Sequence, residues 1–188
     1  MPPRSLAILP AAFFALAAVV NALDGTLPSL VWICNAMNLL LAVALAARWP
    51  RGIWLATLWL LVGVPLWLVD LAAGSGLRPH SFFTHVAAAA VAVVAVRRTP
   101  RPPGGLWWQA AVVGVALQLL ARAITPPAEN VNLAFAAYTS VAALSPRMAD
   151  PSLFPLVWAI NLVLLVLLIL AIERGLVGLT SSRGRRPT

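Results

Sequence analysis

Two side chains with complementary chemistry stand out in this sequence, the thiol of Cys34 and the imidazole of His85. A thiol becomes a nucleophile when a base lies within hydrogen-bond reach and a third group orients that base. Asparagine amides can donate hydrogen bonds to the oxyanion that forms during acyl transfer. We therefore predict that Cys34 is a catalytic nucleophile and that His85 is its base. The residues that we expect to orient the base or to hold the oxyanion are Asn35, Asn38, Asp70, Asn132 and Asn161.

Each of these residues also has a structural interpretation. A single buried cysteine packs as a small apolar side chain, and an ionisable residue inside a membrane serves either structure or function. Asp70 either orients His85, binds a cationic lipid head group, or lies as an ordinary acid near the membrane interface. Sequence spacing alone leaves these alternatives open.

The same inventory of residues argues against several other kinds of site. Cys34 is the only cysteine, so the chain can form neither an internal disulfide nor a cysteine-rich metal site. His80 and His85 lie about 140° apart around a helix, a spacing that does not suit one metal ion. The sequence has no glycine-rich phosphate loop, no G-x-S-x-G motif and no dinucleotide fingerprint. We therefore predict neither a metal nor a cofactor.

The composition indicates what kind of scaffold must position these residues. Of the 188 residues, 62% are hydrophobic and only 10% are charged, whereas soluble domains carry about 25% charged residues. The mean hydropathy is +0.93. A protein of this size cannot bury so much apolar surface in its own core, so we expect the chain to lie in a bilayer. We predict one transmembrane bundle over residues 1–177 and a disordered, arginine-rich cytoplasmic tail over residues 178–188.

Apolar runs of sufficient length predict the fold class. A transmembrane helix needs about 20 mostly apolar residues. The sequence therefore predicts an all-α polytopic membrane protein with six transmembrane helices, at residues 5–23, 28–47, 52–73, 80–96, 105–124 and 153–171. The apolar run 131–144 is too short to cross a bilayer. This run lies within the outer segment 125–152, between the fifth and sixth predicted helices. We expect it to form a re-entrant or interfacial element there.

The 13 basic residues, all of them arginine, predict the orientation. Cytoplasmic loops carry the excess of arginine, and with both termini in the cytoplasm only Arg78, Arg122 and Arg147 fall on the outer side. We therefore predict a multi-pass protein of the cell (plasma) membrane with cytoplasmic N- and C-termini. The first apolar run is rather long for a cleaved signal peptide. A nucleic-acid partner is not expected despite the net charge of +8, because the arginines are dispersed between apolar runs.

The two candidate catalytic residues lie at one predicted depth. At 1.5 Å per residue, Cys34 lies roughly 9 Å and His85 roughly 8 Å from the outer ends of their helices. Most of the other polar residues of the predicted spans also gather toward the outer side. Because polar groups inside a bilayer are costly, such a cluster indicates a functional site. We expect this site to open outward.

Three short segments resemble a known family. They are LVWICNAMNLLLAVAL around Cys34, SFFTHVAAAAVAVV around His85, and AENVNLAF followed by Asp150 and Pro151. In this order they resemble the transmembrane protein 164 family and its bacterial relatives. That family is similar in turn to the androgen-induced-1-like lipid hydrolases. The resemblance runs over residues 30–161. It implies a membrane-embedded acyltransferase acting on phospholipid acyl chains, notably those of ether lipids, with Cys34 as nucleophile and His85 as base. The motif WICN lacks a second histidine that the family would place beside the cysteine.

Two functions therefore follow from the sequence. The first is thiol-dependent acyl transfer or hydrolysis on the acyl chains of membrane lipids. The second is non-enzymatic, either a lipid-binding or transport element or a small subunit of a homo- or hetero-oligomeric membrane complex, since helices with stripes of small residues associate readily. A shared cavity for the thiol and the ring favours the enzyme, and helix faces that point apart favour the second function.

Overall fold

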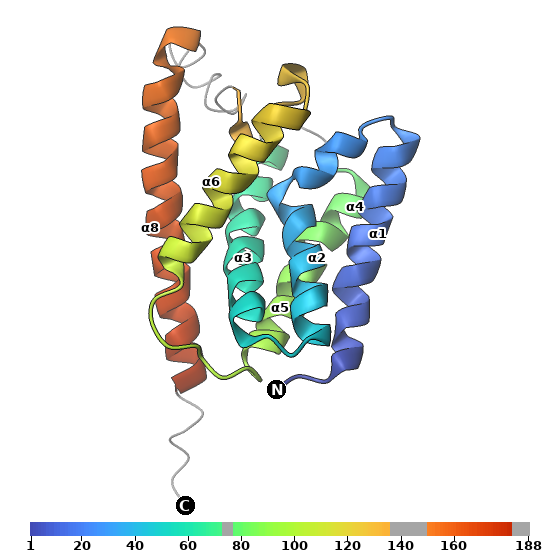
Figure 1. Cartoon of the computed structure of the whole chain (residues 1–188), viewed down its shortest axis with the longest axis vertical. Coiled ribbons are helices and arrows are strands. Elements are labelled where there is room, and N and C mark those ends of the chain that lie inside the picture. Colours follow the sequence, from blue (N-terminus) through green and yellow to red (C-terminus); the bar gives the residue numbers. More distant parts are fainter. Residues whose placement is uncertain (73–76, 136–149, 182–188) are drawn as a thin grey trace, which may run out of the picture.

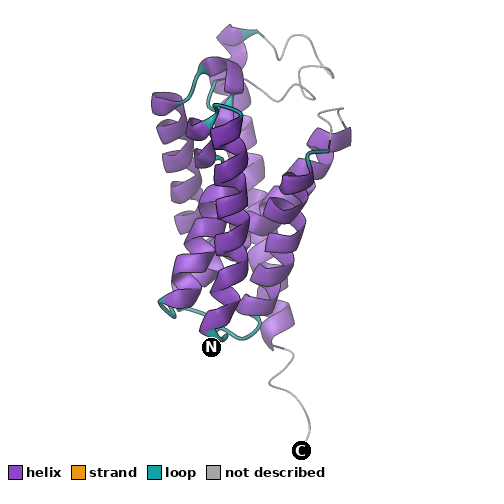
Figure 2. Ribbon diagram, turned by 90° about the vertical axis from the view of Figure 1, so that its right-hand side faces the viewer, coloured by secondary structure: helices purple, strands orange, loops and turns teal. Residues whose placement is uncertain are grey.

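The computed structural model describes residues 1–72, 77–135 and 150–181, and within these ranges the chain is helical and has no strand (Figures 1 and 2). Its α-helices are α1 (Ile8–Leu23), α2 (Ile33–Ala46), α3 (Pro50–Ala72), α4 (Pro79–Phe82), α5 (Ala88–Val96), α6 (Trp107–Ile124) and α8 (Phe154–Ser181). A π-helical turn, η3 (Phe83–Ala87), joins α4 to α5. The short 3-10 turns are η1 (Arg4–Ala7), η2 (Leu27–Val31), η4 (Pro127–Glu129), η5 (Val131–Leu133) and η7 (Pro151–Leu153).

Five of the described helical rods are long and apolar enough to cross a membrane. They are Arg4–Leu23, Pro50–Ala72, Pro79–Val96, Trp107–Ile124 and Phe154–Thr180. The remaining rod, α2, has only 14 residues. It is shortened because the chain from Leu27 to Val31 forms the 3-10 turn η2, and Trp32, with ψ at 132°, interrupts the helix before Ile33.

The first half of α3 forms the centre of the hydrophobic core. Every residue from Gly52 to Leu60 on this helix is buried, together with Val62. Leu41 and Leu45 of α2 pack against it and are completely or almost completely buried. Beyond Val62 the residues of α3 become partly exposed, and several of them line a cavity.

The two ends of the bundle differ in charge. The start of α1 and the end of α8 lie at one end, together with the connections α2–α3 and α5–α6 (Figure 1). We name this the inner end and the opposite one the outer end. The described arginines at the inner end are Arg4 before α1, Arg48, Arg97, Arg98 and Arg101 in the connections, Arg51 in the first turn of α3 and Arg174 in the last turns of α8. This arrangement agrees with the side to which the arginine bias assigns these residues.

The predicted fourth helix, at residues 80–96, contains a local irregularity. Its rod, Pro79–Val96, contains the π-helical turn Phe83–Ala87 between two α-helical parts. Single π-helical turns are rare, weaken the regular hydrogen bonding, and are frequent at functional sites. His85 occupies the middle of this turn.

The described part of the outer segment folds against the bundle. Val131 and Asn132 are buried, and η5 contacts both α6 and η2. Residues 136–149, which hold most of the predicted re-entrant run 131–144 and also Arg147, lie outside the described residues. At the other end of the chain, α8 continues to Ser181, past the predicted boundary at residue 177. The tail that we predicted beyond it, residues 182–188, is likewise outside the described part.

Candidate functional site

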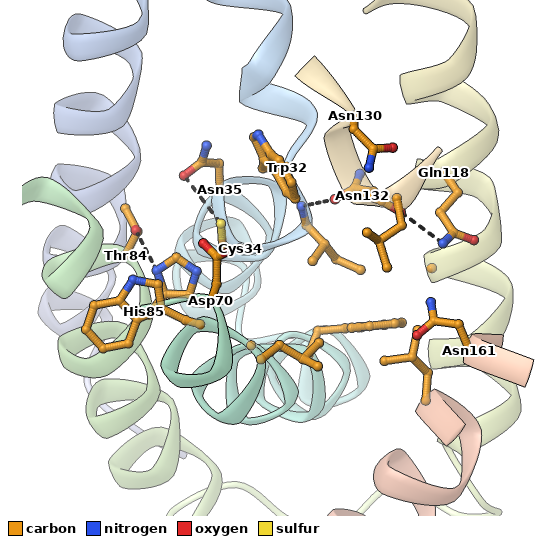
Figure 3. Close-up of a pocket in the computed structure, with 18 of the residues that line it drawn as sticks. Trp32, Cys34, Asn35, Asp70, Thr84, His85, Gln118, Asn130, Asn132 and Asn161 are labelled. Carbon is orange, nitrogen blue, oxygen red and sulfur yellow. Dashed lines mark hydrogen bonds between the residues drawn. The ribbon is translucent and has the colours of Figure 1, made fainter. Parts of the chain in front are cut away.

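A cavity of about 500 Å³ lies between the helices, and Figure 3 draws part of its lining. Its volume is within the range of small-molecule sites. Asn21, Asp70 and Arg78, from the outer end of the bundle, are among the lining residues. Six of the seven predicted site residues line it, namely Cys34, Asn35, Asp70, His85, Asn132 and Asn161. Asn38 does not line it. The cavity therefore brings together the nucleophile and base that the sequence predicts, although they are far apart in the chain.

Cys34 is the second residue of α2, in the first turn of the helix. The N–H groups of a first helical turn have no carbonyl partner within the helix, and the thiol lies beside those of Asn35 and of Cys34 itself. The Cys34 thiol also donates a long hydrogen bond to Asn35 Oδ1, with sulfur and oxygen 3.9 Å apart. The sulfur therefore lies in the first turn of α2, at the positive end of the helix dipole.

The His85 ring is held by contacts on one edge and one face. Its Nδ1 lies 2.8 Å from the carbonyl oxygen of Ser81, which can only accept a hydrogen bond, so Nδ1 carries the proton and donates it. Thr84 Oγ1 is 3.3 Å from the same nitrogen. The indole of Trp67 stacks on the ring at 5.4 Å between centroids and 11° between planes. With Nδ1 protonated, Nε2 has the free lone pair that a general base needs.

Asn38 joins the two helices that carry the candidate nucleophile and base. Its Nδ2 donates to the Cys34 carbonyl at 2.9 Å and to the Thr84 carbonyl at 3.1 Å. Thr84 directly precedes His85, so this one amide fixes the start of α2 against η3. Because both N–H groups of Asn38 are used and the side chain is fully buried, its contact with backbone takes the place of the oxyanion contact that we expected from the sequence.

The other predicted polar residues lie on opposite sides of the cavity. In Figure 3, Asn35 and Asp70 lie on the same side as Cys34 and His85, whereas Asn161 lies across from them. Asn35 Nδ2 has no hydrogen-bond partner among the residues that the structure describes, and this residue lines the cavity. Asn35 is therefore the side chain beside the thiol with a donor still to offer.

Asn132 has a different environment, in which its amide is bonded to the backbone on all sides. Its Oδ1 accepts a hydrogen bond from Ile33 N–H at 2.8 Å. Its Nδ2 donates to the Val31 carbonyl at 2.7 Å and to the Leu117 carbonyl at 3.4 Å. Although Asn132 borders the cavity, its side chain thus connects η2, α2 and α6 and has no donor left for a ligand.

Three residues of the site were not among the predicted ones. Ser81 and Trp67 orient His85, and Trp67 Nε1 also donates to Ser81 Oγ at 3.2 Å. Gln118 borders the far side, where its amide donates to the Asn132 carbonyl at 2.9 Å and accepts from Trp158 Nε1 at 3.1 Å. Helical spacing of four residues gives a signal for Ser81, which lies on the same face as His85. Nothing in the sequence signals the contacts of Trp67 and Gln118, which come from other helices.

The site has no set of side chains suited to a metal. Among residues 1–72, 77–135 and 150–181, no three His, Cys, Asp or Glu side chains lie close enough together to hold an ion. The polar groups that line the cavity include a thiol, two imidazoles, amides, hydroxyls, carboxylates and the guanidinium of Arg78.

Comparisons with protein-family models, with curated proteins and with solved structures find no match to this chain. The resemblance of three segments to the transmembrane protein 164 family thus stays a prediction from the sequence.

Proposed function

We propose that the chain is a six-span protein of the plasma membrane, with cytoplasmic termini, that catalyses thiol-dependent acyl transfer or hydrolysis on phospholipid acyl chains. In this proposal α2, together with η2, crosses the membrane as the sixth rod. The outer end of the bundle faces away from the cytoplasm, because the arginines gather at the inner end. Membrane lipids are then both the solvent and the substrate.

One observation carries the enzymatic proposal, which is that Cys34 and His85 line the same cavity from two helices joined by Asn38. The hydrogen bond from Nδ1 to Ser81 reserves Nε2 for the role of base. The first turn of α2 supplies backbone N–H groups near the sulfur, and Asn35, which contacts the thiol through its Oδ1, has an Nδ2 that is left to donate to a substrate. Nucleophile, base and oxyanion donors are the parts that acyl transfer requires.

The proposed reaction has two halves. First, His85 Nε2 takes the thiol proton as the Cys34 sulfur attacks the ester carbonyl carbon. The oxyanion accepts hydrogen bonds from the Asn35 amide and the free backbone N–H groups of the α2 first turn. The ester C–O bond then breaks, His85 returns the proton to the leaving alkoxide, and a thioester remains on Cys34. In the second half, water or the hydroxyl of a lysolipid attacks this thioester by the same steps.

The thioester intermediate is the direct test. The purified protein is placed in nanodiscs with a phospholipid that carries an alkyne-tagged acyl chain, and the sole cysteine is analysed by mass spectrometry for a hydroxylamine-sensitive acyl adduct. We expect the adduct on wild-type protein and a rate about 10²-fold to 10⁴-fold lower for His85→Gln, the usual contribution of a general base. Absence of the adduct from wild-type protein overturns the proposal.

A matched control asks whether any thiol suffices. The double variant Cys34→Ala with Ser152→Cys moves the only thiol to an exposed outer position. We expect no acyl adduct on it, because Ser152 does not line the cavity that holds His85 and the first turn of α2, and the Asp150 carboxylate beside it is too weak a base to take a thiol proton. Acylation of the relocated thiol at the wild-type rate would show that the adduct forms non-specifically.

The same variant also tests the orientation. In intact cells, a membrane-impermeant maleimide should label Ser152→Cys in the Cys34→Ala background. It should fail to label Pro100→Cys, which lies in the α5–α6 connection at the inner end. The opposite labelling pattern would reverse the proposed orientation.

A second function, lipid binding without chemistry, is favoured by one contact. The hydrogen bond of the Cys34 thiol goes to Asn35 rather than to the imidazole. In this alternative the cavity holds a lipid, and Cys34 only lines it. Lipid retained equally by wild-type protein and Cys34→Ala through purification, with no acyl adduct on the wild type, would establish this function instead.

A further inference from the structure

The start of α2 is capped by a side chain from a distant part of the chain. Trp32, the residue at the N-cap position, makes no side-chain capping hydrogen bond. The cap comes from Asn132, whose Oδ1 accepts the Ile33 N–H at 2.8 Å across 99 residues of sequence. A side-chain oxygen at this position satisfies one of the N–H groups that a helix leaves without partners.

The backbone around Asn132 is strained into the conformation that allows this contact. Asn130, Asn132 and Leu133 all have positive φ, at 43°, 55° and 57°. Asparagine tolerates this region better than most residues, whereas for Leu133 it is costly. The strained loop is held by Gln118, which donates to the Asn132 carbonyl, and by the hydrogen bond between Ser29 and Glu129. The fold thus holds a costly loop in place at the point where it meets α2.

The capped residue directly precedes the candidate nucleophile. The Ile33 N–H is bonded to Asn132, and the next two N–H groups of the same turn, those of Cys34 and Asn35, have no carbonyl partner within the helix. We propose that Asn132 is a positioning residue, which fixes the first turn of α2 so that these N–H groups stay at the thiol and at the oxyanion of its substrate. This inference rests on the proposed function, and it makes the outer segment an integral part of the catalytic site.

Two substitutions separate capping from general stabilisation. Asn132→Ala removes the acceptor and both donated hydrogen bonds, whereas Asn132→Asp keeps an acceptor for Ile33 N–H and loses the donors to Val31 and Leu117. Three quantities are measured for each protein in nanodiscs, namely the rate of acyl-adduct formation on Cys34, amide hydrogen exchange over residues 33–36, and the melting temperature. Thr125→Ala serves as control, since it loses a hydrogen bond to Ala121 in the same region without touching α2.

We expect Asn132→Ala to accelerate exchange over residues 33–36 about tenfold, the usual effect of losing a helix cap, and to slow acylation by a similar factor. Asn132→Asp should restore both to near wild-type values although its melting temperature stays lowered. Thr125→Ala should leave exchange over 33–36 unchanged. The inference is wrong if Asn132→Asp exchanges and acylates as Asn132→Ala does, or if Asn132→Ala leaves both quantities unchanged.

The two measurements also separate this inference from the proposed function. If wild-type protein forms no acyl adduct, the proposed function fails, and exchange over residues 33–36 alone decides whether Asn132 fixes this turn. If the adduct forms but Asn132→Ala acylates normally, the proposed function stands and the positioning role of Asn132 is overturned.

Discussion

Glu173 offers the sharpest test of how this bundle is held together. It lies on α8, and its side chain is almost fully buried. Its Oε1 accepts a hydrogen bond from Leu106 N–H at 3.0 Å, and its Oε2 accepts one from Trp107 N–H at 3.1 Å. These two N–H groups belong to the start of α6, so a carboxylate from one helix caps another. Because α8 also lines the cavity, this contact holds one wall of the site in place.

The expected loss of unfolding free energy in Glu173→Ala follows from the two N–H groups that lose their acceptor. Glu173→Ala leaves both without this acceptor, the first in a buried and the second in a partly buried place, at a cost of about 1 to 3 kcal/mol each, so about 2 to 6 kcal/mol in total. Glu173→Gln keeps one acceptor, and about half of that loss is expected. The ion pair with Arg101, at 3.6 Å, adds less than about 1 kcal/mol because Arg101 is partly exposed.

The assay is equilibrium unfolding of the purified protein in one detergent at one concentration. Asp24→Asn is the matched control, because the carboxylate of Asp24 pairs with Arg78 at 3.8 Å where both side chains are largely exposed. Its effect should stay below about 1 kcal/mol. If Glu173→Ala destabilises the protein no more than Asp24→Asn does, the buried cap is not what secures α8 to α6, and the reasoning fails.

Two further substitutions probe the walls of the cavity. Gly114→Ala brings a Cβ to 2.4 Å from the Trp59 ring, so we expect α6 and α3 to separate at a cost of about 1 to 3 kcal/mol in unfolding free energy. Gly175→Ala on α8, where nothing lies within 4 Å of the new Cβ, should be neutral or slightly stabilising, and an equal loss in both variants would contradict the packing argument. Trp67→Phe keeps a ring against His85 but loses the bond to Ser81 Oγ, so it should cost about 0.5 to 1.5 kcal/mol and slow acylation of Cys34 less than His85→Gln does. A larger rate loss in Trp67→Phe than in His85→Gln would show that the indole itself takes part in the reaction.

The positions of most helices were predictable from the lengths of the apolar runs in the sequence. The predicted run 105–124 corresponds to α6 (Trp107–Ile124), and the run 52–73 corresponds to α3 (Pro50–Ala72). The prediction was wrong for the start of the second helix, since residues 28–32 form a 3-10 turn and a break before Ile33. Hydropathy cannot indicate this break, because the amide that caps the new helix start belongs to Asn132, far along the chain.

The lining of the cavity was predictable for Cys34 and His85, and the contacts of the other polar residues were less so. Equal depth in two predicted helices correctly indicated one cavity for Cys34 and His85. Residue type marked Asn38 and Asn132 as polar groups at this level but not their partners, which are backbone carbonyls and N–H groups of other elements. Such contacts depend on how helices pack, and periodicity within one helix carries no information about that.

The break before Ile33 connects the fold to the proposed chemistry. Were α2 continuous from Leu27, the N–H groups of Cys34 and Asn35 would bond to carbonyls one turn earlier and would be unavailable to a ligand. Leaving N–H groups without partners at membrane depth costs several kcal/mol each. Asn132 satisfies the first of the freed groups, while the next two remain beside the sulfur at the cavity wall. In the proposed function, these two N–H groups and the Asn35 amide are the donors to the acyl oxyanion.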